Sequence, residues 1–205
     1  MMQLEVLVEE PSAKEAMRHV LPRVLGQRAS FKIINLGSKY KLLKVLGERL
    51  AAYRQRIESG ESLRILVLVD LDDDDCMRLK KDLEEKAAGA GVHTKTRPDS
   101  AGHFLVINRI VVEELESWFI GDPTALRKAF PKLPAINEKT KLFRNPDNGG
   151  SWEALHGFLK KHGIYKKHYP KIEAARRIAP YLDISRNRSK SFNAFLKGLE
   201  AALQS

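Results

Sequence analysis

The chain has 205 residues, of which 43% are apolar. It contains 36 Lys and Arg against 26 Asp and Glu, which gives a net charge of +10. This composition excludes a disordered or collagen-like chain and fits a domain with a substantial core. A single cysteine, Cys76, excludes an internal disulfide and a cysteine-rich zinc site. No apolar run approaches the roughly 20 residues of a spanning helix, and the first residues lack a signal-peptide pattern, so we expect a cytoplasmic protein without membrane contact.

The positive charge is concentrated in the last part of the chain. Residues 1–120 hold 19 basic and 19 acidic side chains, whereas residues 121–205 hold 17 basic and 7 acidic ones. This asymmetry separates a candidate polyanion-binding region from a neutral region with clustered carboxylates. A lysine-rich face that only promotes solubility is the alternative interpretation.

The first 120 residues alternate between strand and helix patterns. Ser12 is expected to cap the first helix, with Glu15 completing a capping box, and Gly26 is expected to end it. The continuous aliphatic run before Asp70 is typical of a strand buried on both faces. In chain order, the predicted elements are a strand over 3–8, a helix between 12 and 26, a strand over 31–36, a helix up to the turn at 59–60, a strand over 65–69, a helix over 73–88, an edge strand over 92–97, a strand over 104–112 and a helix over 114–120.

This alternation predicts an α/β fold, a three-layer sandwich with a largely parallel sheet, over residues 1–122. From 123 onward, prolines and the turn at 148–150 break the chain into short segments. Three helical patterns follow, over 151–162, 168–181 and 189–203. We therefore expect residues 123–205 to form a basic, mainly helical region that packs on the α/β domain as a cap.

Acidic side chains follow two of the predicted strands. Glu9 and Glu10 come after the first strand, and Asp70 and Asp72 end the aliphatic strand. In an open α/β sheet the functional crevice lies beyond the carboxyl ends of the strands, so these groups converge if the two strands are neighbours. Converging carboxylates favour Mg²⁺ or Mn²⁺ as a ligand. The following Asp73–Asp75 is better explained as an acidic first helical turn.

An apolar strand followed by Asp-x-Asp occurs in several enzyme classes. Aspartyl-nucleophile phosphatases prefer Thr or Val where this chain has Asp74, and they carry the motif near the N-terminus, so they are a weaker alternative. Sugar-nucleotide transferases lack the earlier strand with its glutamate. The pair Leu7-Val8-Glu9-x-Pro11-Ser12 and Leu68-Val69-Asp70-Leu71-Asp72 resembles the toprim pattern, in which a glutamate and a later Asp-x-Asp surround Mg²⁺.

The resemblance extends over nearly the whole chain to the bacterial and archaeal family called domain of unknown function 4276. It implies a toprim-like, Rossmann-like fold related to nucleases that work beside ATPases in defence systems. The usual toprim turn has Gly after the glutamate, where this chain has Glu10, so Glu9 and Glu10 remain alternatives for the acid/base. The matching segments are Glu9-Glu10-Pro11-Ser12, Leu21-Pro22-Arg23-Val24-Leu25, Phe31-Lys32-Ile33-Ile34, Val67-Leu68-Val69-Asp70, the stretch from Glu114 to Asp122, Phe143-Arg144-Asn145-Pro146-Asp147, Tyr169-x-Lys171 and Ser189-x-Ser191-Phe192.

A second acidic group precedes a tryptophan. Glu114 and Glu116 match the family pattern, and carboxylates near Asp70 would permit a second metal ion. A solvated helix start is the alternative, and for Glu113 it is preferred. Trp118 is expected to be buried on the opposite side of the helix.

The basic region mixes cations with aromatic rings, as phosphate-backbone surfaces do. The resemblance selects Lys171 and Arg176 as phosphate contacts. Further candidates for nucleic-acid binding are Lys166, Lys167, Arg186 and Arg188.

The leading hypothesis is a Mg²⁺-dependent (or Mn²⁺-dependent) toprim-like nuclease that cleaves phosphodiester bonds in nucleic acid. Asp70 and Asp72 would bind metal, Glu9 would bind metal or act as acid/base, and Glu114 and Glu116 would be further metal ligands. The alternative from another class is a non-catalytic nucleic-acid-binding subunit or partner of an ATPase in a defence-type system.

Overall fold

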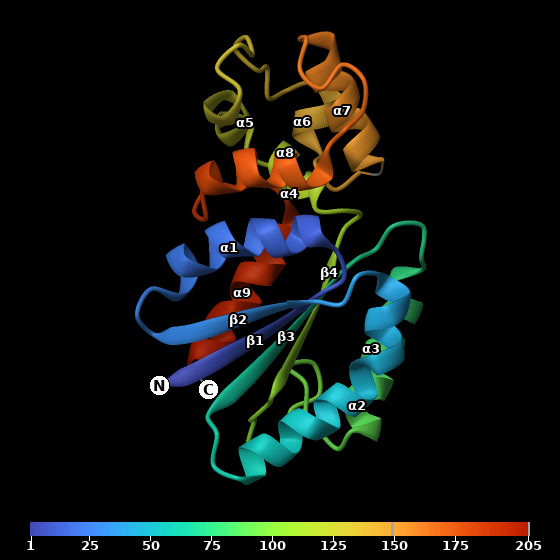
Figure 1. Ribbon diagram of the computed structural model, residues 1–205, viewed down its shortest axis with the longest axis vertical. Coiled ribbons are helices and arrows are strands. Elements are labelled where there is room, and N and C mark those ends of the chain that lie inside the picture. Colours follow the sequence, from blue (N-terminus) through green and yellow to red (C-terminus); the bar gives the residue numbers. More distant parts are fainter. Residues whose placement is uncertain (149, 205) are drawn as a thin grey trace.

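Four parallel strands form the sheet of the computed structural model, which describes residues 1–148 and 150–204. The sheet has the order β2-β1-β3-β4, so β1 and β3 are neighbours (Figure 1). Its strands are β1 (Met2–Val8), β2 (Ala29–Asn35), β3 (Leu63–Asp70) and β4 (Val106–Val111). Because the strands are parallel, their carboxyl ends share one edge of the sheet.

Helices connect the strands and continue beyond the last one. In chain order they are α1 (Pro11–Leu25), α2 (Lys39–Glu58), α3 (Cys76–Gly89), α4 (Glu116–Ile120), α5 (Pro123–Ala129), α6 (Lys141–Arg144), α7 (Ser151–Lys161), α8 (Lys171–Ile178), the 3-10 helix η1 (Ala179–Tyr181) and α9 (Lys190–Gln204). None of the helices in the described part of the chain is long and apolar enough to cross a membrane.

The helices cover both faces of the sheet, which confirms the predicted three-layer α/β sandwich (Figure 1). On one face, α2 and α3 pack on apolar side chains such as Leu7 and Val67. On the other face, α1 and α9 pack on side chains such as Val6 and Leu66. Successive residues of a strand thus enter opposite cores, and this explains why β3 is apolar along its whole length.

The region after residue 122 divides into two parts. Helices α5, α6, α7 and α8 lie beyond the carboxyl ends of the strands, and α8 packs on α1 (Figure 1). Helix α9 returns to the sheet and packs along β4. Its rings Phe192 and Phe195 contact Trp118, which is fully buried as predicted. One core therefore includes residues from both sides of position 122, and a domain boundary there stays a prediction.

Several expected boundaries were wrong. Ser12 does not cap α1, because Pro11 starts the helix one residue earlier with Glu10 at the capping position, and the Ser12 hydroxyl donates to Glu10 instead. Gly26 does end the helix, with a φ of 55°. Helix α3 begins at Cys76 rather than at residue 73, and Asp75 caps it.

The prediction of an edge strand over 92–97 was also wrong. This segment forms a single bridge, between Thr94 and Val106. Thr94 and Arg97 exchange backbone hydrogen bonds, and the Thr94 hydroxyl donates to Glu84 and accepts from the Arg97 N–H. These local bonds fold the segment into a turn where a strand would need partners along its whole length.

Candidate carboxylate site at the ends of the strands

Four buried acidic side chains lie at the carboxyl edge of the sheet, following three adjacent strands. Glu9 follows β1 directly, Asp70 is the last residue of β3, and Glu114 and Glu116 follow β4. Their exposed fractions are 4%, 8%, 9% and 1%, respectively. The sheet register pairs Asp70 with Val111, so the end of β3 lies beside the start of the acidic segment after β4. Strands β1 and β3 are also paired, and the Asp70 N–H donates to Glu9, so the predicted convergence of Glu9 with Asp70 is present.

Glu9 is linked to the next strand by a hydrogen bond. Its Oε1 accepts from the backbone N–H of Asp70, and this bond together with the charge of Lys39 favours the ionised form. Burial opposes both, and the pKa of Glu9 rises from 4.5 to about 7. Glu9 can therefore gain or lose a proton near neutral pH.

Asp70 is held in the most acidic environment of the site. Burial raises its pKa well above 3.8, and the neighbouring charges of Glu9, Glu116, Asp72 and Glu10 raise it further. Such mutual repulsion requires the carboxylates to lie close together. At neutral pH the group is stable only with protons or a bound cation among these oxygens.

Glu116 is the most deeply buried of the four acids. Burial raises its pKa to about 7, while Lys171 lowers it and Glu114 raises it. Its Oε1 and the hydroxyl of Tyr169 lack a partner in hydrogen-bonding geometry, although the two groups lie close enough for the hydroxyl to lower the pKa of Glu116. An unpartnered buried carboxylate oxygen is costly in an apo site and is a natural position for a ligand.

Glu114 anchors the helical region to this edge. Its Oε2 accepts from the backbone N–H of Trp152 at 3.2 Å and from the Ser151 hydroxyl at 3.3 Å. Its Oε1 lies 3.4 Å from Nζ of Lys171. Both ends of this network come from the starts of helices, α7 and α8, so the basic region contributes directly to the acidic site.

Lys39 forms the opposite side of the site. Its ammonium lies 2.7 Å from Oδ2 of Asp72 and 2.8 Å from Oδ2 of Asp74, and it donates to the carbonyl of Leu71. These acids raise the pKa of Lys39, although burial opposes them. Asp72 was expected to converge with Glu9 and Asp70. It is near enough to raise the pKa of both, yet its side chain is 46% exposed and pairs with Lys39.

The acidic side chains of the site are oxygen donors of the kind that Mg²⁺ prefers. Within residues 1–148 and 150–204, no three His, Cys, Asp or Glu side chains are arranged as a preformed metal site. The donors nevertheless fit, because Mg²⁺ takes only one or two protein carboxylates and completes its shell with water and phosphate. Asp70 and the unpartnered oxygen of Glu116 meet this requirement, and Glu9 lies within the same cluster.

Only one of the predicted phosphate contacts on α8 and the preceding loop lies in the carboxylate site. Lys171 lies in the site, whereas Nε of Arg176 is 3.0 Å from Oε1 of Glu15, on the α1 side of α8. Lys166 and Lys167 are exposed in the loop between α7 and α8.

The two predicted arginines before α9 also contact protein groups. Arg186 pairs with Asp122 and Asp183, at 3.6 and 3.5 Å. Arg188 donates to the carbonyl of Phe143 and lies 3.3 Å from Glu138. Their part in nucleic-acid binding stays a prediction.

Three residues of the site were not predicted from the sequence, namely Lys39, Ser151 and Trp152. For Lys39 a signal existed, since it follows the second strand of a parallel sheet and thus lies at the same edge as Glu9. Ser151 and Trp152 begin a helix far along the chain, and their contact with Glu114 depends on how the helical region packs.

Fold and site together define an α/β protein with a buried acidic centre at the carboxyl edge of a parallel sheet. The family model described as domain of unknown function 4276 matches residues 8–200, so the chain belongs to this family. No curated protein and no solved structure matches the chain.

Proposed function

We propose that this protein is a Mg²⁺- or Mn²⁺-dependent toprim-like nuclease that hydrolyses phosphodiester bonds of nucleic acid at the carboxylate site. The observation that carries the proposal is the convergence of buried acids from the ends of β1, β3 and β4, flanked by Lys39 and Lys171. Acidic residues attract divalent cations, and the lysines attract phosphate. A phosphodiester that bridges both is the substrate class that uses all of these groups.

The acids have separate roles in this proposal. Asp70 and Glu116 would hold the ion, Glu9 would act as acid/base, and Asp72 and Glu114 are the further ligands that a second ion would use. A bound divalent ion stabilises negative charge on phosphoryl oxygens and lowers the pKa of water. Lys171 and Lys39 lie where they can orient a phosphate by its charge.

Glu9 is the better acid/base of the two candidate glutamates. Its pKa of about 7 suits proton transfer near neutral pH, whereas Glu10 accepts a hydrogen bond from Ser12 at the start of α1. In hydrolysis, Glu9 would take a proton from the attacking water as the water oxygen bonds to phosphorus. The bond from phosphorus to the leaving oxygen breaks, and the leaving oxygen takes a proton from solvent.

The test compares Asp70→Asn with Asp73→Asn, an exposed aspartate in the same turn. Cleavage of labelled single- and double-stranded DNA and RNA is measured in Mg²⁺ and Mn²⁺, and Mn²⁺ binding is measured by calorimetry. We expect Asp70→Asn to lose cleavage and most Mn²⁺ affinity while remaining folded, and Asp73→Asn to retain both.

Three outcomes would contradict the nuclease. Wild-type activity in Asp70→Asn removes the site from catalysis. No cleavage of any substrate by the wild type, with Mn²⁺ bound, favours a non-catalytic nucleic-acid-binding subunit. A phosphoenzyme trapped at Asp70 during turnover of small phosphomonoesters favours the aspartyl phosphatase.

A further inference from the structure

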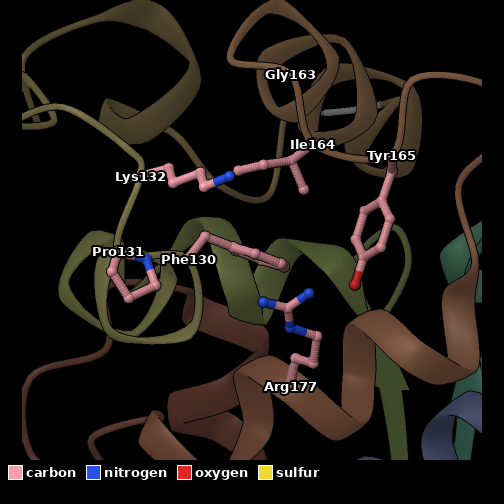
Figure 2. Close-up of a pocket in the computed structure, with 7 residues that line it drawn as sticks. All are labelled: Phe130, Pro131, Lys132, Gly163, Ile164, Tyr165 and Arg177. Atoms are coloured by element: carbon pink, nitrogen blue, oxygen red, sulfur yellow. The ribbon is translucent and has the colours of Figure 1, made fainter.

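A pocket of about 340 Å³ opens between α5, the loop before α8 and α8 itself (Figure 2). Phe130, Ile164 and Tyr165 form its apolar lining, and Lys132 and Arg177 bring two cations to it. Figure 2 shows Phe130 between the side chains of Lys132 and Arg177, with Tyr165 along one side. The pocket thus combines aromatic surface with positive charge.

The two cations are held differently. The guanidinium carbon of Arg177 lies 4.5 Å from the centre of the Phe130 ring, and the group donates to the carbonyl of Ala129 at 3.1 Å. Glu173 is a weak partner of Arg177, at 3.8 Å. Lys132 is exposed and has no ion pair among the described residues. A ligand at this pocket therefore meets a fixed guanidinium and an available ammonium.

Aromatic contacts connect this pocket to the carboxylate site. The ring of Tyr165 is 6.1 Å from that of Tyr169, which lies beside Glu116. The ring of Tyr169 is 6.5 Å from that of Trp152, and the backbone N–H of Trp152 donates to Glu114. His156 fixes the loop by bonding the carbonyl of Tyr165 at 2.8 Å. The pocket and the carboxylates thus lie at two ends of one row of rings.

We propose that this pocket receives one unpaired nucleotide of the strand whose phosphodiester bond lies at the carboxylate site, an inference that rests on the proposed function. Proteins that bind single strands combine cations along the backbone with aromatic rings that stack on bases. The volume suits one small ligand. A base inside a duplex is stacked and paired, so its edge and faces cannot enter such a pocket, and the site would select single-stranded or frayed substrate.

The test measures binding separately from cleavage. Full-length Asp70→Asn protein in Ca²⁺ is titrated with a fluorescently labelled single strand and with the blunt duplex of the same sequence. Lys132→Gln and Tyr165→Leu are added to this background, with Lys128→Gln as a matched control, because Lys128 is exposed on α5 outside the pocket. Melting temperatures identify any variant that is misfolded.

We expect Tyr165→Leu to weaken single-strand binding roughly tenfold, a loss typical of one stacked base. Lys132→Gln should weaken it and lower the salt slope by about 0.7, as for one lost phosphate contact in a single strand. Lys128→Gln and all duplex affinities should be unchanged. Equal single-strand affinities for Lys132→Gln and Lys128→Gln overturn the inference.

A nucleoside monophosphate serves as competitor and distinguishes the source of the nucleotide. Pocket-dependent binding of the monophosphate without competition from the strand identifies a free nucleotide as ligand and overturns the proposed strand subsite. If the wild type cleaves but the pocket variants bind as tightly as their background, the proposed strand subsite is wrong and the nuclease proposal stands. If strand binding depends on the pocket but no cleavage occurs, the subsite stands and the nuclease proposal is wrong.

Discussion

The carboxylate of Glu9 accepts a hydrogen bond from the backbone N–H of Asp70, so an acid at the end of β1 binds the end of β3. Both side chains are at least 92% buried, and burial raises the pKa of each. The charge of Glu9 raises the pKa of Asp70 further, whereas the Asp70 N–H lowers the pKa of Glu9. The sheet thus ends in a pair of acids whose stability depends on protons or cations. This dependence can be measured without knowing the substrate.

The metal-free protein should lose stability as the pH rises from about 5 to about 8. The pKa of Glu9 is raised from 4.5 to about 7, so within this window the folded state binds more protons than the unfolded state, and the free energy of unfolding falls. Glu9 alone accounts for about 3 kcal/mol, and Glu116, raised to about 7, acts in the same direction. Urea unfolding with a chelator at several pH values measures the change.

Glu9→Gln should flatten this pH profile, because the amide oxygen can still accept from Asp70 but carries no charge. The control is Glu85→Gln, on the exposed side of α3, which should keep the wild-type profile. A wild-type profile that rises with pH in the absence of metal would contradict the burial of unpaired acids at this edge.

Ser191→Ala should destabilise the fold without altering the carboxylate site. The Ser191 hydroxyl accepts from Nε1 of Trp118 at 2.9 Å, and both residues are buried. Its removal leaves the indole N–H without that partner, which costs about 1–3 kcal/mol of unfolding free energy. Chemical unfolding compares it with Ser100→Ala, in an exposed turn. Equal stabilities of the two variants would show that water replaces the hydroxyl.

The convergence of Glu9 with Asp70 could be predicted because it follows from the sheet alone. Residues that follow parallel strands share one edge, and β1 and β3 had only to be neighbours. Glu114 and Glu116, in contrast, were selected from the family pattern, and Asp72, expected in the same cluster, pairs with Lys39. Periodicity also identified the strands and most helices, since a strand buried on both faces leaves a continuous apolar run. The chemistry proposed for these acids stays a prediction.

Partners contributed by distant segments could not be predicted in this way. Arg176 was selected as a phosphate contact, yet the structure pairs it with Glu15, whose position on a neighbouring helix depends on how α8 packs on α1. The prediction of an edge strand over 92–97 was wrong for a local reason, because the hydrogen bonds of the Thr94 hydroxyl compete with strand pairing. Sequence patterns show which residues are charged or apolar, but not which counter-ion each one meets.

Salt dependence separates the two candidate phosphate contacts on α8. If nucleic acid crosses the carboxylate site, Lys171→Gln should lower the slope of log K against log salt by about 0.7 for a single-stranded substrate. Arg176→Gln should lower it less, because Arg176 pairs with Glu15 on the α1 side of α8 and not with the acids of the carboxylate site. Binding is measured in Ca²⁺ at several salt concentrations, with Lys86→Gln as surface control. A slope for Lys171→Gln equal to that of the control would remove Lys171 from the phosphate contacts.

Lys39→Met should strengthen divalent binding and weaken cleavage at the same time. The ammonium of Lys39 lies 2.7 Å from Asp72 and lowers the pKa of Glu9, so it competes with a cation for the same negative potential. Its removal leaves the acids less compensated. Mn²⁺ affinity should rise at least tenfold, because even at the dielectric constant of water one unit charge about 4 Å from a divalent ion is worth about 2 kcal/mol.

Cleavage should fall in the same variant, because a phosphate loses a cation that would orient it. Calorimetric titration with Mn²⁺ and single-turnover cleavage are measured for Lys39→Met and for Lys41→Met, an exposed lysine on the same helix with no ion pair among the described residues. Only the Lys39 variant should show the opposite changes in affinity and rate. The prediction is wrong if Lys39→Met stays folded but binds Mn²⁺ more weakly than Lys41→Met. Lys39 would then position the acids for Mn²⁺, and its ammonium would not compete with the ion.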